Sequence, residues 1–176
     1  MSQRSGWRRH FCGQAPDSVL RSWLIEPDSL TARCQRLCGQ FRVRLLRQGR
    51  AKSLADEGDG RALVRVREVV LECDGIPVIF AHTTLSASSN GRLTRWLARL
   101  GNRSLGSLLF AYPGFRRGDI EFYRLDRRHP LFCRAAELAG GSDALWARRS
   151  SHRLAGQSVL VTEVFLPAIR RLSPGR

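Results

Sequence analysis

The stretch Leu63-Val-Arg-Val-Arg-Glu-Val-Val-Leu-Glu-Cys-Asp-Gly75 decides the fold, because it predicts one long strand that ends in a tight turn. β-branched and aliphatic residues dominate it, and Asp74-Gly75 is a strong signal for a two-residue hairpin. The chain should therefore return as an antiparallel strand over residues 76–84. Successive side chains of a strand point to opposite faces, so Arg67 shares its face with Leu63, Val69, Leu71 and Cys73.

Two charged residues stand in apolar strands. Arg67 would place a guanidinium where an unpaired charge is costly, so it needs a carboxylate from the protein or from a ligand. A second apolar strand, residues 158–166, carries Glu163 on the face of Val159, Val161 and Phe165. Two interpretations stay open: the two charges form a structural ion pair or face water, or they line one pocket.

Length and composition predict one folded domain. The chain has 176 residues, of which 43% are hydrophobic, which suits a single core and argues against disorder. We expect a flexible basic tail over residues 1–15 and one domain over residues 16–176. The formal net charge is +15, and Lys52 is the only lysine among the thirty basic residues. Such a surface attracts nucleic acid or anionic metabolites without specifying which.

Neither a membrane segment nor a metal centre is predicted. The apolar runs are shorter than a membrane span, and the arginines near the start precede no apolar leader, so a cytoplasmic protein is expected. Five cysteines without a CxxC pair predict reduced, mostly buried thiols. Cys34 and Cys38 lie one helical turn apart, but no histidine stands at ligand spacing to complete a zinc site.

The order of elements predicts an α+β fold. Helices over 19–24 and 30–38 form a hairpin, and Asp17-Ser18 caps the start of the first helix. The further expected elements are a strand over 41–47, a loop over 48–61, helices over 93–100 and 105–110, a strand over 117–125, an irregular stretch over 126–143 with a helix at 132–138, and a last hairpin of strands 146–154 and 158–166. The hairpin connections favour a single antiparallel β-sheet of about six strands.

Four motifs follow one another in the chain: Arg67-Glu-Val-Val-Leu-Glu-Cys-Asp-Gly75, Leu105-Gly106 with Leu109-Phe110, Trp146 with Arg148-Arg149-Ser150, and Thr162-Glu-Val-Phe-Leu-Pro167. In this order and spacing they resemble chorismate pyruvate-lyase. That family of small bacterial enzymes releases pyruvate from chorismate and leaves 4-hydroxybenzoate, the starting ring for ubiquinone. The resemblance covers the chain from Trp23 to Pro167.

The resemblance implies a site inside the domain, with helical hairpins covering an internal ligand cavity. Arg67 would pair with the ring carboxylate, and the backbone amide of Leu105 would meet the same group. Glu163 would take the ring hydroxyl, and Leu30 would cover the ring. A planar guanidinium matches a carboxylate, a helix-start amide donates to it, and a carboxylate accepts a hydroxyl proton. No metal, nucleotide or redox cofactor is implied, and a monomer is expected.

Some residues depart from the family pattern, and rival functions remain. His82 stands where arginine is common, and we interpret it as a satisfied core or surface histidine. The pairs Arg116-Arg117, Arg127-Arg128 and Arg148-Arg149 are interpreted as solvated, although Arg148-Arg149 belongs to the family pattern and would support the cavity. The rivals are a small-molecule-binding domain like the effector domains of bacterial regulators, and a nucleic-acid binder. No nucleic-acid recognition motif is present, so no nucleic-acid partner is expected.

Overall fold

The computed structural model describes residues 6–58, 60–86, 90–106, 114–154 and 156–172. Their strands form one seven-stranded sheet in the order β1-β2-β3-β7-β6-β4, with β5 also pairing with β6, and every pair is antiparallel. The strands are β1 Phe41–Lys52, β2 Leu63–Cys73, β3 Ile76–Ser86, β4 Arg116–Arg117, β5 Glu121–Asp126, β6 Ala144–Leu154 and β7 Gln157–Phe165. The helices are α1 Ser18–Leu24, α2 Leu30–Leu37, α3 Arg92–Arg99, α5 Pro130–Ala139 and the 3-10 helix η1 Pro167–Arg171. The predicted α+β fold with a single antiparallel sheet is confirmed.

The central hairpin forms where the sequence predicts it. Asp74 and Gly75 both adopt positive φ angles, 52° and 78°, as a tight two-residue turn between right-twisted strands requires. The carboxylate of Asp74 also accepts a hydrogen bond from the backbone amide of Gln40 at 2.7 Å. The turn is thereby tied to the start of β1, and the register of β1 against β2 follows from it.

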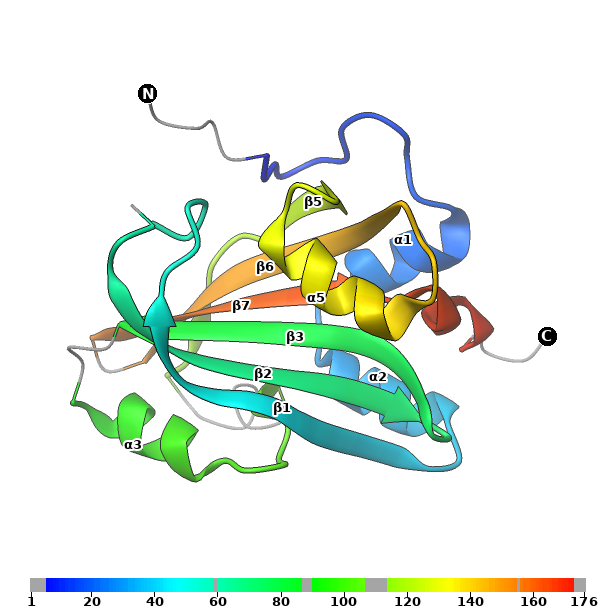
Figure 1. Cartoon of the computed structure of the whole chain (residues 1–176). Coiled ribbons are helices and arrows are strands. Elements are labelled where there is room, and N and C mark those ends of the chain that lie inside the picture. Colours follow the sequence, from blue (N-terminus) through cyan, green and yellow to red (C-terminus); the bar gives the residue numbers. More distant parts are fainter. Residues whose placement is uncertain (1–5, 59, 87–89, 107–113, 155, 173–176) are drawn as a thin grey trace.

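Helices cover the two faces of the sheet unequally (Figure 1). The first face carries α1 and α2, whose apolar residues pack on alternate side chains of β2 such as Val69 and Leu71. The opposite face carries α5, which packs on Val70 of β2 and Phe80 of β3. The sheet is thus a wall between two cores, and each strand residue faces one or the other according to its parity.

Local signals set the ends of the first two helices. The side chain of Asp17 caps α1 by accepting from the amide of Leu20 at 2.9 Å. Ser29 caps α2 by accepting from the amide of Ala32 at 3.3 Å. Ser29 lies next to the turn around Pro27, whereas Asp17 lies at the opposite end of α1, so a side-chain cap marks the start of each helix.

Several boundaries differ from the sequence prediction. β1 continues to Lys52, because its basic side chains lie on an exposed edge strand where charge is tolerated. The strand expected over 117–125 is two strands, and the helix expected at 132–138 begins at Pro130, a residue suited to the first helical turn. The helix expected over 105–110 falls largely outside the described residues, of which Leu105 and Gly106 are helical.

Part of the expected tail is packed. Trp7 is 4% exposed, and its indole nitrogen donates to a carboxylate oxygen of Asp56 at 2.5 Å. Arg8 pairs with Phe122 of β5 through two backbone hydrogen bonds. A segment that looks like a basic tail in the sequence therefore adds an edge contact to the sheet, because its tryptophan finds a buried site.

The expectation of reduced cysteines is wrong for one pair. Cys38 and Cys73 form a disulfide between the end of α2 and the end of β2, with their Cα atoms 5.5 Å apart. Cys34 is a buried free thiol. The pairing was hidden in the sequence because 35 positions separate the two residues and only the hairpin geometry brings them together.

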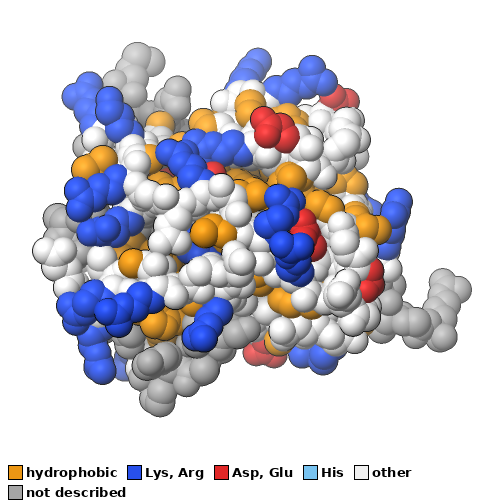
Figure 2. Space-filling view, turned by 60° about the horizontal axis from the view of Figure 1, so that its bottom comes forward, with side chains coloured by type: hydrophobic (Ala, Val, Ile, Leu, Met, Phe, Trp, Pro, Cys, Tyr) orange, Lys and Arg blue, Asp and Glu red, His pale blue; other side chains and the backbone are white. Residues whose placement is uncertain are grey.

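The surface is strongly basic near β1 and α3. These two elements carry eight basic residues and no acidic one: Arg42, Arg44, Arg47, Arg50, Lys52, Arg92, Arg95 and Arg99. Figure 2 shows basic side chains outnumbering acidic ones on the face at the bottom of Figure 1. This field favours the approach of anions. No helix in the described ranges has the length and apolar character needed to cross a membrane.

Candidate functional site

A pocket opens on the sheet face that α1 and α2 cover, and all four residues expected at the site line it. They are Leu30, Arg67, Leu105 and Glu163. The floor is apolar and comes from three strands, with Val69 on β2, Ala81 on β3 and Val161 on β7 among its residues. The pocket holds about 570 Å³ of empty space, part of it continuous with solvent, between closely spaced side chains. It is therefore narrow and mostly filled by its own lining.

The strand register sets the separation of the two charged residues. Arg67 lies opposite Thr83, which lies opposite Val161, and Glu163 is two residues further along β7. Two strand spacings of about 4.8 Å and two residues of about 3.4 Å place the Cα atoms of Arg67 and Glu163 about 12 Å apart. The two side chains therefore enter the pocket from different strands.

Arg67 is almost completely buried, with 1% of its surface exposed. One of its terminal nitrogens donates to the carbonyl oxygens of Gly101 and Arg103, at 2.8 and 2.7 Å. Its Nε atom is buried without a hydrogen-bond partner, and no carboxylate pairs with Arg67 among the residues that the structure describes. Burial lowers the pKa of Arg67 to about 10, so the side chain stays charged at neutral pH. It is a charged donor set ready for an anion.

Glu163 lies beside a second buried arginine. Arg148 of β6 stands directly opposite Glu163 of β7, and its Nε atom donates to Glu163 Oε2 at 2.7 Å. The same guanidinium donates to the carbonyl oxygens of Leu24 and Glu26, at 3.3 and 2.6 Å. Arg148 thus fixes the carboxylate and also ties the end of α1 to the sheet. The sequence prediction of solvated arginines is wrong for Arg148, which is 2% exposed.

Two cover segments meet over the pocket. Leu30 and Thr31 open α2, and Ser104 and Leu105 follow α3. The hydroxyl groups of Thr31 and Ser104 are hydrogen-bonded at 2.5 Å, which joins the two segments directly. Leu105, 6% exposed, is in the first helical turn after α3, so its backbone amide is at a helix start.

Two further residues line the pocket, and one of them, Arg117, is half-buried, so its interpretation as a solvated arginine is wrong. Arg117 of β4 donates to the carbonyl oxygen of Pro27 at 2.8 Å and to the hydroxyl of Ser150 at 3.0 Å. His152 of β6 lies opposite Arg117, and its Nε2 atom is 3.2 Å from the same hydroxyl. Burial and the nearby Arg117 lower the pKa of His152 to about 4, so its ring is neutral at neutral pH. The alternation of Arg148, Ser150 and His152 along β6 was the available signal.

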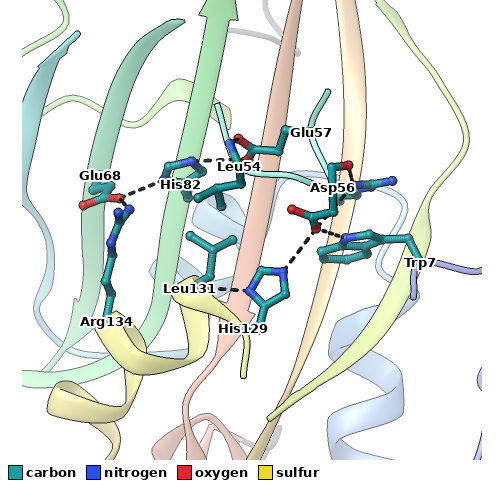
Figure 3. A network of polar contacts seen from close by, with 10 residues as sticks. Trp7, Leu54, Asp56, Glu57, Glu68, His82, His129, Leu131 and Arg134 are labelled. Carbon is teal, nitrogen blue, oxygen red and sulfur yellow. Dashed lines mark hydrogen bonds and ion pairs between the residues drawn. The ribbon is translucent and has the colours of Figure 1, made fainter. Parts of the chain in front are cut away.

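His82 is not part of this pocket. It lies on the opposite face of the sheet, in a buried network with Glu57, Glu68 and Arg134 (Figure 3). Its Nδ1 atom is 2.8 Å from Glu68 Oε1, and its Nε2 atom is 3.2 Å from Glu57 Oε1, a charge contact whose angles are not those of a hydrogen bond. The interpretation of His82 as a core histidine agrees with this position, but only its Nδ1 atom has a hydrogen-bond partner.

Metal ligands do not gather in this site. Within the described ranges, no group of three or more His, Cys, Asp or Glu side chains is placed to hold a metal ion. The pocket instead combines three arginines, one ion-paired glutamate and an apolar floor. Such a site suits a small organic anion that carries a hydroxyl group.

The family model for chorismate lyase matches residues 1–172. The chain belongs to the chorismate lyase family. A "probable chorismate pyruvate-lyase" of Dechloromonas aromatica is 68% identical over 174 residues, covering 97% of this chain and 99% of the relative. A relative of the same name from Nitrosomonas europaea is 45% identical over 159 residues, covering 87% of this chain and 89% of the relative. These similarities span nearly the whole chorismate lyase chain.

The fold itself is shared more widely. The ligand-binding domain of a protein assigned to the GntR family of transcriptional regulators, from Bordetella bronchiseptica, superposes with a TM-score of 0.50 at 15% identity. The match covers 74% of this chain and 88% of that domain. At this identity the likeness concerns the fold alone. Chorismate lyases therefore share their sheet architecture with domains that have another role.

Proposed function

We propose that this chorismate lyase converts chorismate into 4-hydroxybenzoate and pyruvate. The observation that carries the proposal is the convergence of Arg67 and Glu163, 96 positions apart in the chain, on one apolar pocket. In the proposed complex Arg67 binds the ring carboxylate and the amide of Leu105 donates to the same group. Glu163 accepts the ring hydroxyl, and Leu30 packs on the ring. Each contact uses a group that the pocket already presents.

The reaction asks the protein mainly for orientation and exclusion of water. The bond between the ring carbon and the ether oxygen breaks, the hydrogen on the neighbouring carbinol carbon leaves, and the ring becomes aromatic. If that hydrogen passes directly to the methylene carbon of the side chain, pyruvate forms without a base. A narrow pocket that folds the side chain over the ring would favour this step. Glu163, held by Arg148, would orient the carbinol group.

The test is to mix the purified protein with chorismate and to follow both products. Pyruvate is measured with a coupled dehydrogenase, and 4-hydroxybenzoate by chromatography. Equal amounts of the two, released in step with the loss of chorismate, support the proposal. Intact chorismate after prolonged incubation with folded protein would overturn it.

A second candidate is a domain that binds an aromatic carboxylate without turning it over. The fold likeness to a regulator's ligand-binding domain favours it. The same experiment separates the two, because a binding domain would retain chorismate or 4-hydroxybenzoate in a titration and release no pyruvate. If the protein is a lyase, we further propose that its 4-hydroxybenzoate is used to make ubiquinone. We also propose that it acts as a monomer in the cytoplasm.

A further inference from the structure

The proposed substrate has a second carboxylate that its aromatic product lacks. Chorismate carries one carboxylate on the ring and another on the enolpyruvyl side chain, whereas 4-hydroxybenzoate keeps only the first. If Arg67 holds the ring carboxylate, the second anionic group needs its own partner inside a pocket that excludes water. A subsite for this second group rests on the proposed function and extends it.

The position of the second carboxylate follows from the chemistry of the ring. The ether oxygen sits on the carbon next to the one that carries the hydroxyl group. With the hydroxyl at Glu163, the side chain leaves the ring from the neighbouring carbon, meta to the carboxylate at Arg67, and we place it on the side of Glu163 that faces away from Arg67. The strands on that side of Glu163 are β6 and β4, which carry Arg148 and Arg117.

Arg148 is already engaged. Its guanidinium donates to Glu163 and to the carbonyl oxygens of Leu24 and Glu26, and it is 2% exposed. Releasing it would break the ion pair that holds Glu163 and free the end of α1. Arg117 donates to a carbonyl oxygen and to a hydroxyl group, and we place the charge that arrives with the substrate beside it.

Arg117 is partly buried at the pocket wall. Burial lowers its pKa and the positive charge of Arg148 lowers it further, whereas the carboxylates of Glu163 and Asp28 raise it. A substrate carboxylate beside Arg117 would add to this attraction and offset the repulsion from Arg148. The hydrogen bonds of Arg117 to Pro27 and Ser150 hold its guanidinium at the mouth of the α1–α2 turn, next to the pocket residues Asp28 and Leu30.

His152 lines the pocket beside Arg117 with an uncharged ring. Its buried ring is uncharged at neutral pH because Arg117 and burial both disfavour the imidazolium. It therefore adds no positive charge of its own, and a ring N–H remains a hydrogen-bond donor. The hydroxyl of Ser150 lies between the two side chains, at 3.0 Å from Arg117 Nε and 3.2 Å from His152 Nε2.

We propose that Arg117, supported by Ser150 and His152, binds the carboxylate of the enolpyruvyl side chain. This contact exists in the substrate complex and disappears when pyruvate leaves. Arg67 and Arg117 then grip the two carboxylates of the substrate from β2 and β4, on opposite sides of Glu163 in the strand order. The folded side chain is held over the ring, which is the geometry that the hydrogen transfer needs.

The test compares a ligand that has the second carboxylate with one that lacks it. In Arg117→Met, kcat/KM for chorismate should fall about tenfold to a hundredfold, as expected for a lost charge-assisted hydrogen bond. The Kd for 4-hydroxybenzoate, measured by titration calorimetry, should stay within about threefold of the wild type. Arg117→Lys keeps the charge, so its kcat/KM for chorismate should lie between that of the wild type and that of Arg117→Met. Thermal unfolding of each variant checks that it is folded.

Arg116→Met is the matched control, because Arg116 is the exposed neighbour on the same strand and does not line the pocket. It should leave both constants unchanged. Equal losses in chorismate turnover and in 4-hydroxybenzoate affinity would overturn the subsite, since Arg117 would then merely shape the pocket. Unchanged turnover in Arg117→Met would overturn it as well. A wild-type protein without lyase activity would instead defeat the proposed function, before any variant is compared.

Discussion

Arg67 and Arg65 show how two arginines on one strand face can differ. Both point to the same face of β2, but Arg67 lines the pocket floor and Arg65 lies outside it, near Gln48 and Thr94. Both keep a buried Nε atom without a hydrogen-bond partner, and a terminal nitrogen of Arg67 donates to two backbone carbonyls. A buried guanidinium of this kind is a binding group whose own hydrogen bonds fix its orientation.

We predict that Arg67→Lys lowers kcat/KM for chorismate about tenfold to a hundredfold, because an ammonium keeps the charge but loses the planar fork. The Kd for 4-hydroxybenzoate should weaken in parallel, since the ring carboxylate is common to both ligands. Arg65→Lys, two residues away, should leave both constants near wild type. Steady-state kinetics and calorimetry provide the measurements, and equal behaviour of the two variants would contradict the role given to Arg67.

Glu163 offers an unusually well matched comparison. Glu163→Gln removes the charge that faces Arg148, and we expect kcat to fall about tenfold and the affinity for 4-hydroxybenzoate to weaken. Glu121→Gln breaks the corresponding pair with Arg149, whose Nε–Oε2 distance is 2.8 Å compared with 2.7 Å for Arg148 and Glu163. Glu121 does not line the site pocket, so its variant should keep full activity. If both variants lose activity alike, the loss reflects stability and not the site.

At the scale of elements, the pocket is closed by two segments that belong to different parts of the chain. The start of α2 and the turn after α3 meet through the hydrogen bond between Thr31 and Ser104. The side chains of Arg67 and Arg148 hold backbone carbonyls of the segments that flank this cover. Opening the pocket therefore requires the cover to separate while the sheet stays in place.

We predict that Thr31→Val speeds the release of 4-hydroxybenzoate about fivefold, because one hydrogen bond contributes about 1 kcal/mol and valine keeps the shape of threonine. Stopped-flow displacement of bound 4-hydroxybenzoate measures the rate. Ser104→Ala should act in the same way, and the double variant should add little to either single change, because both remove the same bond. Additive effects, or unchanged release, would show that this contact does not hold the cover.

At the scale of the whole molecule, polar contacts join the segments that pack on the sheet face opposite the pocket. His82 faces Glu57 and Glu68, and Arg134 of α5 also binds Glu68 (Figure 3). Asp56 joins Trp7 of the N-terminal segment to His129 at the start of α5. His129 Nδ1 accepts from the amide of Leu131, so Nε2 carries the proton that faces Asp56. The loop after β1 is thereby tied to the sheet, to α5 and to the chain start.

The network makes stability depend on pH. Burial alone would lower the pKa of His82, but Glu57 and Glu68 outweigh it and raise the pKa above the ordinary 6.5. The folded protein therefore holds this proton more tightly than the unfolded chain does. Its contribution to stability is fully present below pH 6.5 and is lost as pH rises through the pKa of the folded state. Urea unfolding from pH 6.5 upward should show that decline.

His82→Gln should remove that decline and lower the free energy of unfolding at pH 6.5 by about 3 kcal/mol, because two buried carboxylates lose their imidazolium. His10→Gln is the control, since His10 is exposed and should leave the profile unchanged. The activity measured per folded molecule should stay close to wild type in His82→Gln, because the network and the pocket lie on opposite faces of the sheet. A flat wild-type profile above pH 6.5 would contradict the charge state assigned to His82.

Local chemistry by itself determined the central hairpin, the two N-terminal helices with the Asp17 cap of the first, and the faces of Arg67 and Glu163 within their strands. Such features depend on residues a few positions apart, so periodicity and turn residues suffice to predict them. Only the tertiary structure decided which face of the sheet the helices would close into a pocket, and that Arg117, Arg148 and His152 would stand in its wall. It also decided that Trp7 would be buried and that Cys38 would meet Cys73. These contacts join residues that are far apart in the chain, and alternation along one strand says nothing about what packs against it from elsewhere.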